Sequence, residues 1–201
     1  DARDGLTPVS VPNIPAVNYR ITDDTRLGKG GEAEKFRDNV AAIKALKAIE
    51  AEGRRATPAE QRVLARYVGW GGLANAFAAP ESGKFKPDWE DRGKSLVDLL
   101  TPKELALARR STLDAHYTSE DVIGAMWSAA RRLGFAGGSV LESSMGVGNF
   151  LGLLPEDLTA NTKFVGVEYD SLTARIAALL YPNETVLHSG FQKVPVPDGA
   201  F

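Results

Sequence analysis

Apolar positions in the first quarter of the chain recur at the spacing of a helix. Phe36, Val40, Ile43 and Leu46 lie three or four residues apart. Side chains at this spacing share one face of a helix, which can then pack against a core. The pattern therefore predicts a helix over residues 32–52.

Two capping boxes mark further helix starts. Residues 57–60 (Thr-Pro-Ala-Glu) and 101–104 (Thr-Pro-Lys-Glu) each place threonine before proline and glutamate three residues later. The threonine oxygen can accept the N–H of that glutamate, and proline fits the first helical position. With a short helix predicted over residues 91–100, residues 29–115 are interpreted as a helical N-terminal region. Residues 1–28 are interpreted as an extended arm or linker, because their prolines disfavour a helix.

The pattern changes in residues 116–201, where short apolar runs alternate with helical ones. Residues 139–141, 163–168 and 184–188 are predicted strands, and a helix is predicted over residues 170–180. Strands that alternate with helices indicate a parallel sheet. The predicted fold class is α/β, in which a helical N-terminal region is followed by the first half of a Rossmann-like sheet.

The stretch from Ser139 to Phe150 carries the most informative motif of the chain. Its predicted strand ends at Glu142, and the next loop contains Gly146 and Gly148 before a predicted helix. Glycine lets a ligand approach the backbone closely, and the N–H groups at a helix start favour an anionic group. A glycine loop alone is also consistent with an ordinary turn, so its surroundings decide the interpretation.

A second acidic residue, Glu168, ends the next predicted strand. Ligands of open α/β sheets bind at the carboxyl ends of strands, where an acid can hold ribose hydroxyls. A dinucleotide motif would need glycine where this chain has Leu151, and Glu142 would repel a pyrophosphate. The same carboxylate would attract a sulfonium and an amino group. These residues therefore favour S-adenosylmethionine as the ligand.

Several motifs also carry a family resemblance. Residues 142–150 (Glu-Ser-Ser-Met-Gly-Val-Gly-Asn-Phe) resemble the Glu-Pro-Ser-Ala-Gly-Thr-Gly-Asn-Phe motif of N6-adenine DNA methyltransferases. From about Leu27 onward, the chain is similar to part of the large methyltransferase–helicase fusion proteins of bacterial plasmids, integrative elements and phages. Some of these are associated with antirestriction or defence. The other matching segments are residues 68–73 (Val-Gly-Trp-Gly-Gly-Leu), 115–118 (Ala-His-Tyr-Thr), 148–151 (Gly-Asn-Phe-Leu) and 190–191 (Gly-Phe).

The resemblance implies that residues 116–201 are the cofactor-binding half of an S-adenosylmethionine-dependent methyltransferase domain. Glu142, Gly146 and Gly148 would line the methionine end of the cofactor. Glu168 would hold the ribose hydroxyls, and Phe191 would face the adenine. The full set of implied cofactor-binding residues is Tyr117, Thr118, Glu142, Ser143, Gly146, Gly148, Asn149, Glu168 and Phe191.

The chain departs from the family pattern at three positions. Ser143 stands where proline is usual, Met145 where alanine is usual, and Gly190 where an acid normally meets the adenine amino group. The last change weakens the expected hold on adenine. The segment with Tyr117 and Thr118 keeps the family pattern, which implies that it closes over the methionine end.

The family's catalytic tetrapeptide, Asn-Pro-Pro followed by an aromatic residue, does not occur in the sequence. We therefore assign no catalytic residue and expect a fragment, inactive alone, that ends before this motif. The implied partners are DNA and a helicase domain of the same parent chain, in a bacterial cytoplasm. For the exposed strand at residues 139–142, we expect either self-association through its edge or covering of that edge by the N-terminal arm. The alternatives are a non-catalytic scaffolding or nucleic-acid-binding module with a vestigial cofactor pocket, and a methyltransferase for protein or small molecules.

Composition and charge bear on DNA binding, on metal and nucleophile sites, and on membrane spans. The net charge of −2 means that any contact with DNA depends on local patches. With no cysteine and only His116 and His188 as histidines, neither a metal site nor a nucleophile triad is supported. No stretch is long and apolar enough to suggest a membrane span. Trp70, between glycines, is predicted to be a buried anchor, although stacking on a base is the functional alternative.

Overall fold

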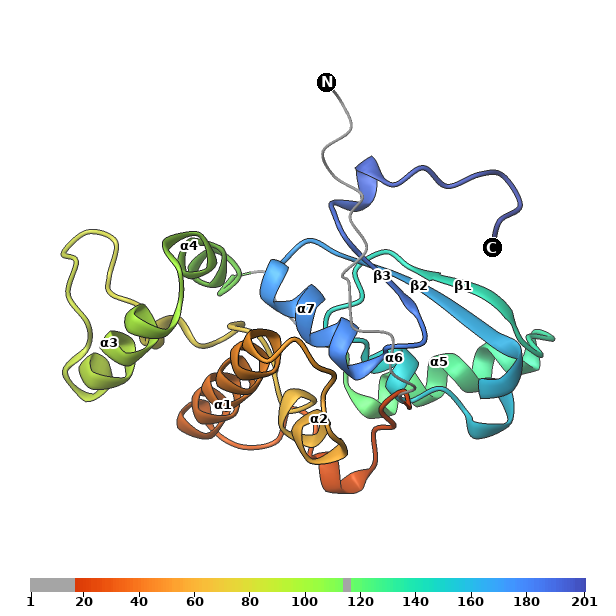
Figure 1. The fold of residues 1–201 in the computed structure, drawn as a ribbon, viewed down its shortest axis with the longest axis horizontal. Coiled ribbons are helices and arrows are strands. Elements are labelled where there is room, and N and C mark those ends of the chain that lie inside the picture. Colours follow the sequence, from red (N-terminus) through yellow and green to blue (C-terminus); the bar gives the residue numbers. More distant parts are fainter. Residues whose placement is uncertain (1–16, 114–116) are drawn as a thin grey trace.

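The computed structural model describes residues 17–113 and 117–201, so most of the predicted arm and His116 lie outside the described residues. The described chain has a mixed α/β fold, with helices beside a small parallel sheet (Figure 1). Within these ranges, no helix has the length and apolar character needed to cross a membrane. The helices are α1 (Glu32–Ala51), α2 (Pro58–Leu64), α3 (Glu90–Leu99), α4 (Pro102–Arg110), α5 (Glu120–Arg132), α6 (Asn149–Gly152) and α7 (Ser171–Leu180), and the strands are β1 (Gly138–Glu142), β2 (Thr162–Glu168) and β3 (Thr185–His188).

The three strands are parallel and follow the order β1-β2-β3. In the register, Gly138 lies opposite Thr162, and Val165 lies opposite Thr185. The three predicted strands are confirmed. Because parallel strands end at the same edge of a sheet, Glu142 and Glu168 come together there.

β1 is an edge strand in the described part of the chain, since its only pairing there is with β2. Its five residues, Gly-Ser-Val-Leu-Glu, contain no proline or lysine to block further pairing. An open strand edge of this kind can recruit another strand. Self-association through β1 remains a prediction.

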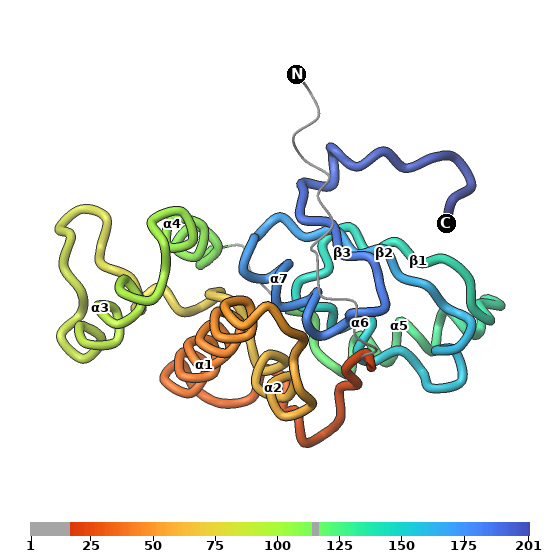
Figure 2. Tube along the Cα trace, in the orientation of Figure 1, coloured from red at the N-terminus to blue at the C-terminus, as the bar shows by residue number. Residues whose placement is uncertain are grey.

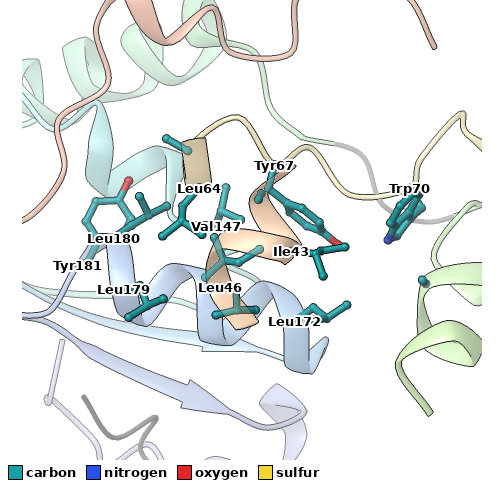
Figure 3. Packing of buried hydrophobic residues seen from close by; sticks show 14 of the residues in the cluster. Ile43, Leu46, Leu64, Tyr67, Trp70, Val147, Leu172, Leu179, Leu180 and Tyr181 are labelled. Atoms are coloured by element: carbon teal, nitrogen blue, oxygen red, sulfur yellow. The ribbon is translucent and has the colours of Figure 1, made fainter. Parts of the chain in front are cut away.

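α7 lies between the sheet and the helical region and supplies the centre of the core. Leu172 and Leu180 of α7 are buried together with Leu46 of α1, Leu64 of α2 and Val147 of the glycine loop (Figure 3). Both α1 and α2 contact α7. The helical region and the sheet therefore share one hydrophobic core.

Both predicted capping boxes form, and the second one extends into a partly buried ion-pair network. Thr101 Oγ1 accepts the N–H of Glu104 at 3.2 Å. The Glu104 carboxylate accepts hydrogen bonds from Arg175 of α7 at 2.8 Å and from Lys47 of α1 at 3.1 Å. Burial alone would raise the pKa of Glu104, but these donors and Thr101 lower it to about 2. The ionised Glu104 thus ties α4 to α1 and α7.

Residues 17–22 run as an extended strap along the ends of α7 and α6 (Figure 2). The N–H of Tyr19 donates to the carbonyl of Leu180 at 2.8 Å, and the N–H of Ile21 donates to that of Gly152 at 3.0 Å. These bonds satisfy carbonyls that a helix end leaves without partners.

Trp70 is 1% exposed, and its ring packs edge-on against Phe36 and Phe77. The ring centroids are 6.1 Å and 5.5 Å apart, within the range of favourable aromatic pairs. The prediction of a buried anchor is confirmed, and the indole has no face free for a base.

Candidate cofactor site

A cavity of about 340 Å³ lies at the carboxyl ends of β1 and β2. Glu142 and Glu168 reach it from the two strands, Gly146 from the glycine loop and Asn149 from the start of α6. The helical region and the N-terminal end of α7 complete the wall. The sequence-based prediction of a shared crevice at the two strand ends thus corresponds to a real cavity.

Glu142 lines both this cavity and a groove beside α5, and one of its carboxylate oxygens is unsatisfied. Its Oε2 atom is buried and has no hydrogen-bond partner among the described residues. Burial, and then the nearby charge of Glu168, raise the pKa of Glu142 to about 8. An isolated buried carboxylate is costly, so this group favours an incoming cation or hydrogen-bond donor.

Glu168 is held in place by backbone donors. Its Oε2 accepts the N–H of Gly146 at 2.9 Å, and its Oε1 accepts the N–H of Asp170 at 2.8 Å. Burial raises the pKa of Glu168, while these two hydrogen bonds oppose the rise. A carboxylate has about four acceptor positions, so Glu168 keeps capacity for ligand hydroxyls.

Met145 anchors the loop between these acids on β2. The Met145 N–H donates to the carbonyl of Val167 at 3.0 Å, which anchors the loop on β2. The Met145 side chain is buried against Gly166, where any Cβ would collide with the Met145 sulfur. The Met145 side chain therefore fits here because β2 has glycine at position 166.

Gly146 and Tyr117 form the contact that covers the loop. Gly146 has φ +57°, and a Cβ there would lie 2.9 Å from Cε1 of Tyr117. Burial raises the pKa of the Tyr117 hydroxyl well above its ordinary value, so it stays neutral. Tyr117 and Thr118 both line the cavity, in the place where the resemblance expects a covering segment.

Asn149, like Glu142, has a buried polar atom without a hydrogen-bond partner in the described chain. The residue is 5% exposed, and its Nδ2 has no hydrogen-bond partner in the described chain. It lines the same cavity. Buried polar groups without partners are rare in folded proteins, so Glu142 and Asn149 are candidates to bind a ligand.

Three residues that the resemblance assigned to the cofactor lie outside this cavity. Ser143 lies with Phe164 in an apolar groove beside β1 and α5. Gly148 has φ +86° and packs against the ring of Tyr181, so its lack of a side chain serves tight packing. Phe191 begins a short 3₁₀ turn after β3 and is 44% exposed.

Sequence reasoning missed the part of the wall that comes from the helical region. Asn39 of α1 is fully buried, and its side chain accepts the N–H of Val68 at 2.9 Å and donates to the carbonyl of Gly69 at 2.5 Å. This pair fixes the backbone that borders the cavity. The motif at residues 68–73 was the only available signal, and it gave no role. The lining residues missed in the helical region are Tyr67, Gly69, Leu107, Arg110 and Ser111, and those missed in the sheet half are Ser144, Met145, Phe150, Tyr169, Asp170 and Thr173.

The cavity offers acidic and amide groups without a metal cluster. Nowhere in residues 17–113 and 117–201 do three histidine, cysteine, aspartate or glutamate side chains group so that they could hold a metal ion. The charged side chains that line the cavity are those of Glu142, Glu168, Asp170 and Arg110. Comparisons with protein-family models, curated proteins and solved structures returned no match.

Proposed function

We propose that this chain binds S-adenosylmethionine in the cavity between β1 and β2, as the cofactor-binding part of a Rossmann-like DNA adenine N6-methyltransferase. The observation that carries the proposal is that Glu142, a lining residue of this cavity, has a buried Oε2 with no hydrogen-bond partner among the described residues. An ammonium group of the cofactor satisfies that oxygen and offsets the repulsion between Glu142 and Glu168.

The donors and acceptors of the site fit the rest of the cofactor. Glu168 has spare acceptor positions for the two ribose hydroxyls, as acids at the second strand end do in nucleotide-binding sheets. The volume of about 340 Å³ falls in the range of small-molecule pockets.

The charge of the cavity argues against a dinucleotide. Glu142, Glu168 and Asp170 all line it, and these carboxylates would repel a pyrophosphate. S-adenosylmethionine instead carries a sulfonium and an ammonium group, so its net charge opposes that of the cavity. Electrostatic complementarity therefore selects the sulfonium cofactor.

The nature of the methyl acceptor rests on the resemblance. The motif at residues 142–150 supports the exocyclic amino group of adenine in DNA as the acceptor. When bound, S-adenosylmethionine supplies an electrophilic methyl group. The residues of this chain would bind and orient it, with Glu142 holding its ammonium group, Glu168 its ribose hydroxyls and Tyr117 excluding water.

Calorimetric titration with S-adenosylmethionine tests the proposal. We expect the wild-type chain to bind and Glu142→Gln, which keeps the shape but removes the charge, to bind about 10- to 100-fold more weakly. Glu156→Gln is the matched control, because Glu156 is exposed and does not line the cavity. Absence of wild-type binding would reject the proposal and favour the scaffolding alternative. Equal affinity of wild type and Glu142→Gln would reject the role of Glu142.

A further inference from the structure

Arg110 is the positive side chain of an otherwise acidic cavity. Among the residues that line it, Arg110 is the sole lysine or arginine, and Glu142, Glu168 and Asp170 are the acids. It is the last residue of α4, which Figure 1 shows beside the N-terminal end of α7. The helical region thus supplies one positively charged side chain, whereas Glu142 and Glu168 come from the ends of the strands.

The backbone that carries Arg110 is fixed. Glu104, in the first turn of the same helix, accepts hydrogen bonds from Arg175 of α7 and Lys47 of α1. These contacts hold α4 against the elements that form the other walls. Arg110 is therefore positioned at the cavity by buried interactions at the opposite end of its own helix.

The guanidinium of Arg110 has no partner of its own within the described chain, in contrast to its neighbour. Arg109 donates to the carbonyl of Ala78 at 2.9 Å and does not line the cavity. Arg110 lines the cavity, is exposed and makes no hydrogen bond or ion pair in residues 17–113 and 117–201. Two adjacent arginines on one helix end thus have different surroundings, and one remains available to a ligand.

A ligand carboxylate needs such a group here. The methionine part of S-adenosylmethionine carries an ammonium and a carboxylate on the same carbon. If the ammonium binds Glu142, the carboxylate enters a cavity with three acids and requires compensation. Arginine pairs with carboxylates through two parallel N–H donors, and the buried Nδ2 of Asn149 is a further donor without a partner.

We infer that Arg110, together with Asn149, binds the α-carboxylate of the cofactor and so selects a ligand that carries an intact amino-acid end. The inference rests on the proposed function and adds a recognition residue from outside the methyltransferase motifs. Arg110 is exposed in the free protein, so water can solvate its charge there without an internal partner.

The test compares two ligands on four proteins, the fourth being Arg110→Lys. Wild type, Arg110→Ala and the control Arg109→Ala are titrated by calorimetry with S-adenosylmethionine and with its decarboxylated analogue, in which hydrogen replaces the carboxylate. We expect Arg110→Ala to weaken S-adenosylmethionine binding about 10- to 100-fold and to leave binding of the analogue unchanged or tighter. Arg109→Ala should change neither. Arg110→Lys should recover part of the loss, because it restores the charge without the paired donors.

The outcomes separate this inference from the proposed function. If wild type binds neither ligand, the proposed function fails and the inference fails with it. If wild type binds but Arg110→Ala loses affinity for both ligands equally, or for neither, only the inference is overturned. A loss of affinity for duplex DNA in an anisotropy assay, with S-adenosylmethionine binding intact, would also overturn it and would assign Arg110 to a phosphate. Matching thermal melts of the variants and wild type exclude misfolding as the cause.

Discussion

The raised pKa of Glu142 predicts that cofactor binding depends on pH in a particular direction. Burial and the charge of Glu168 place this pKa at about 8 in the free protein. The proposed ammonium contact requires the ionised carboxylate, so binding near neutral pH must remove a proton from Glu142. Binding should therefore strengthen as the pH rises towards 8.

The magnitude follows from two titrations. With a pKa of about 8, roughly 1% of Glu142 is ionised at pH 6 and about half at pH 8. The ligand's α-amino group, with an ordinary pKa near 7.8, begins to lose its own proton over the same range. The product of the two fractions rises about twentyfold from pH 6 to a maximum near pH 8 and falls beyond it.

Calorimetry in buffers of different ionisation enthalpy measures this linkage directly. At pH 7 we expect the release of about 0.8 proton per cofactor bound, which is the loss from Glu142 minus a small uptake by the ligand amine. Glu142→Gln should bind weakly, with no rise between pH 6 and 8 and no proton release. A flat wild-type profile, or net proton uptake at pH 7, would refute the assignment of the ammonium to Glu142.

The same carboxyl has an opposite effect on stability. Its folded pKa lies above the unfolded value, so the protonated form favours folding. That contribution is complete below about pH 4.5 and is lost as the pH rises through about 8. In thermal melts without ligand, the melting temperature of Glu142→Gln relative to that of wild type should therefore rise between pH 5 and 9.

Two further predictions concern the support of the site. Glu104→Ala should lower the free energy of unfolding by about 3 kcal/mol in urea titrations, because it leaves Lys47 and Arg175 without their shared carboxylate. The pKa of Glu104, about 2, means that this contribution disappears as the pH falls from about 4.5 towards 2, so a difference that persists at pH 2 would contradict it. Gly166→Ala should lower the melting temperature because its Cβ meets the Met145 sulfur, and Met145→Ala should rescue it. Additive losses in the double variant would contradict this packing account.

The helices and strands could be predicted from the sequence because the patterns that indicate them are local. A capping box fixes a helix start within four residues, and a short apolar run between turn residues indicates a strand. The meeting of Glu142 and Glu168 also followed, because parallel strands that alternate with helices end at one edge. The α/β class and these two acidic positions needed no knowledge of long-range packing.

The three implied cofactor residues that do not line the cavity show where local signals become ambiguous. Glycine at 148 was interpreted as room for a ligand, but the same freedom accommodates the ring of Tyr181. Ser143 follows the last residue of β1, and its position in the neighbouring groove depends on how the chain turns there. Phe191 lies beyond β3, in a short turn whose direction has no sequence signature. In each case the residue type fitted two environments and only tertiary structure selected one.

The wall from the helical region was beyond sequence reasoning for a different reason. Arg110 and Tyr67 lie more than thirty residues before Glu142, and nothing local marks them as neighbours of the sheet. They reach the cavity because α7 buries one face against the strands and another against α1 and α2.

The proposed binding site therefore needs both the helical region and the sheet. The sheet half supplies acids that hold the cationic and hydroxyl groups of the proposed ligand, and the helical half supplies Arg110 and the backbone held by Asn39. Either half alone would present one sign of charge to a zwitterionic amino acid. Binding of the whole ligand should therefore draw on the packing of α4 against α7, so that contacts far from the cavity, such as Glu104 with Arg175, contribute to affinity through the position of Arg110.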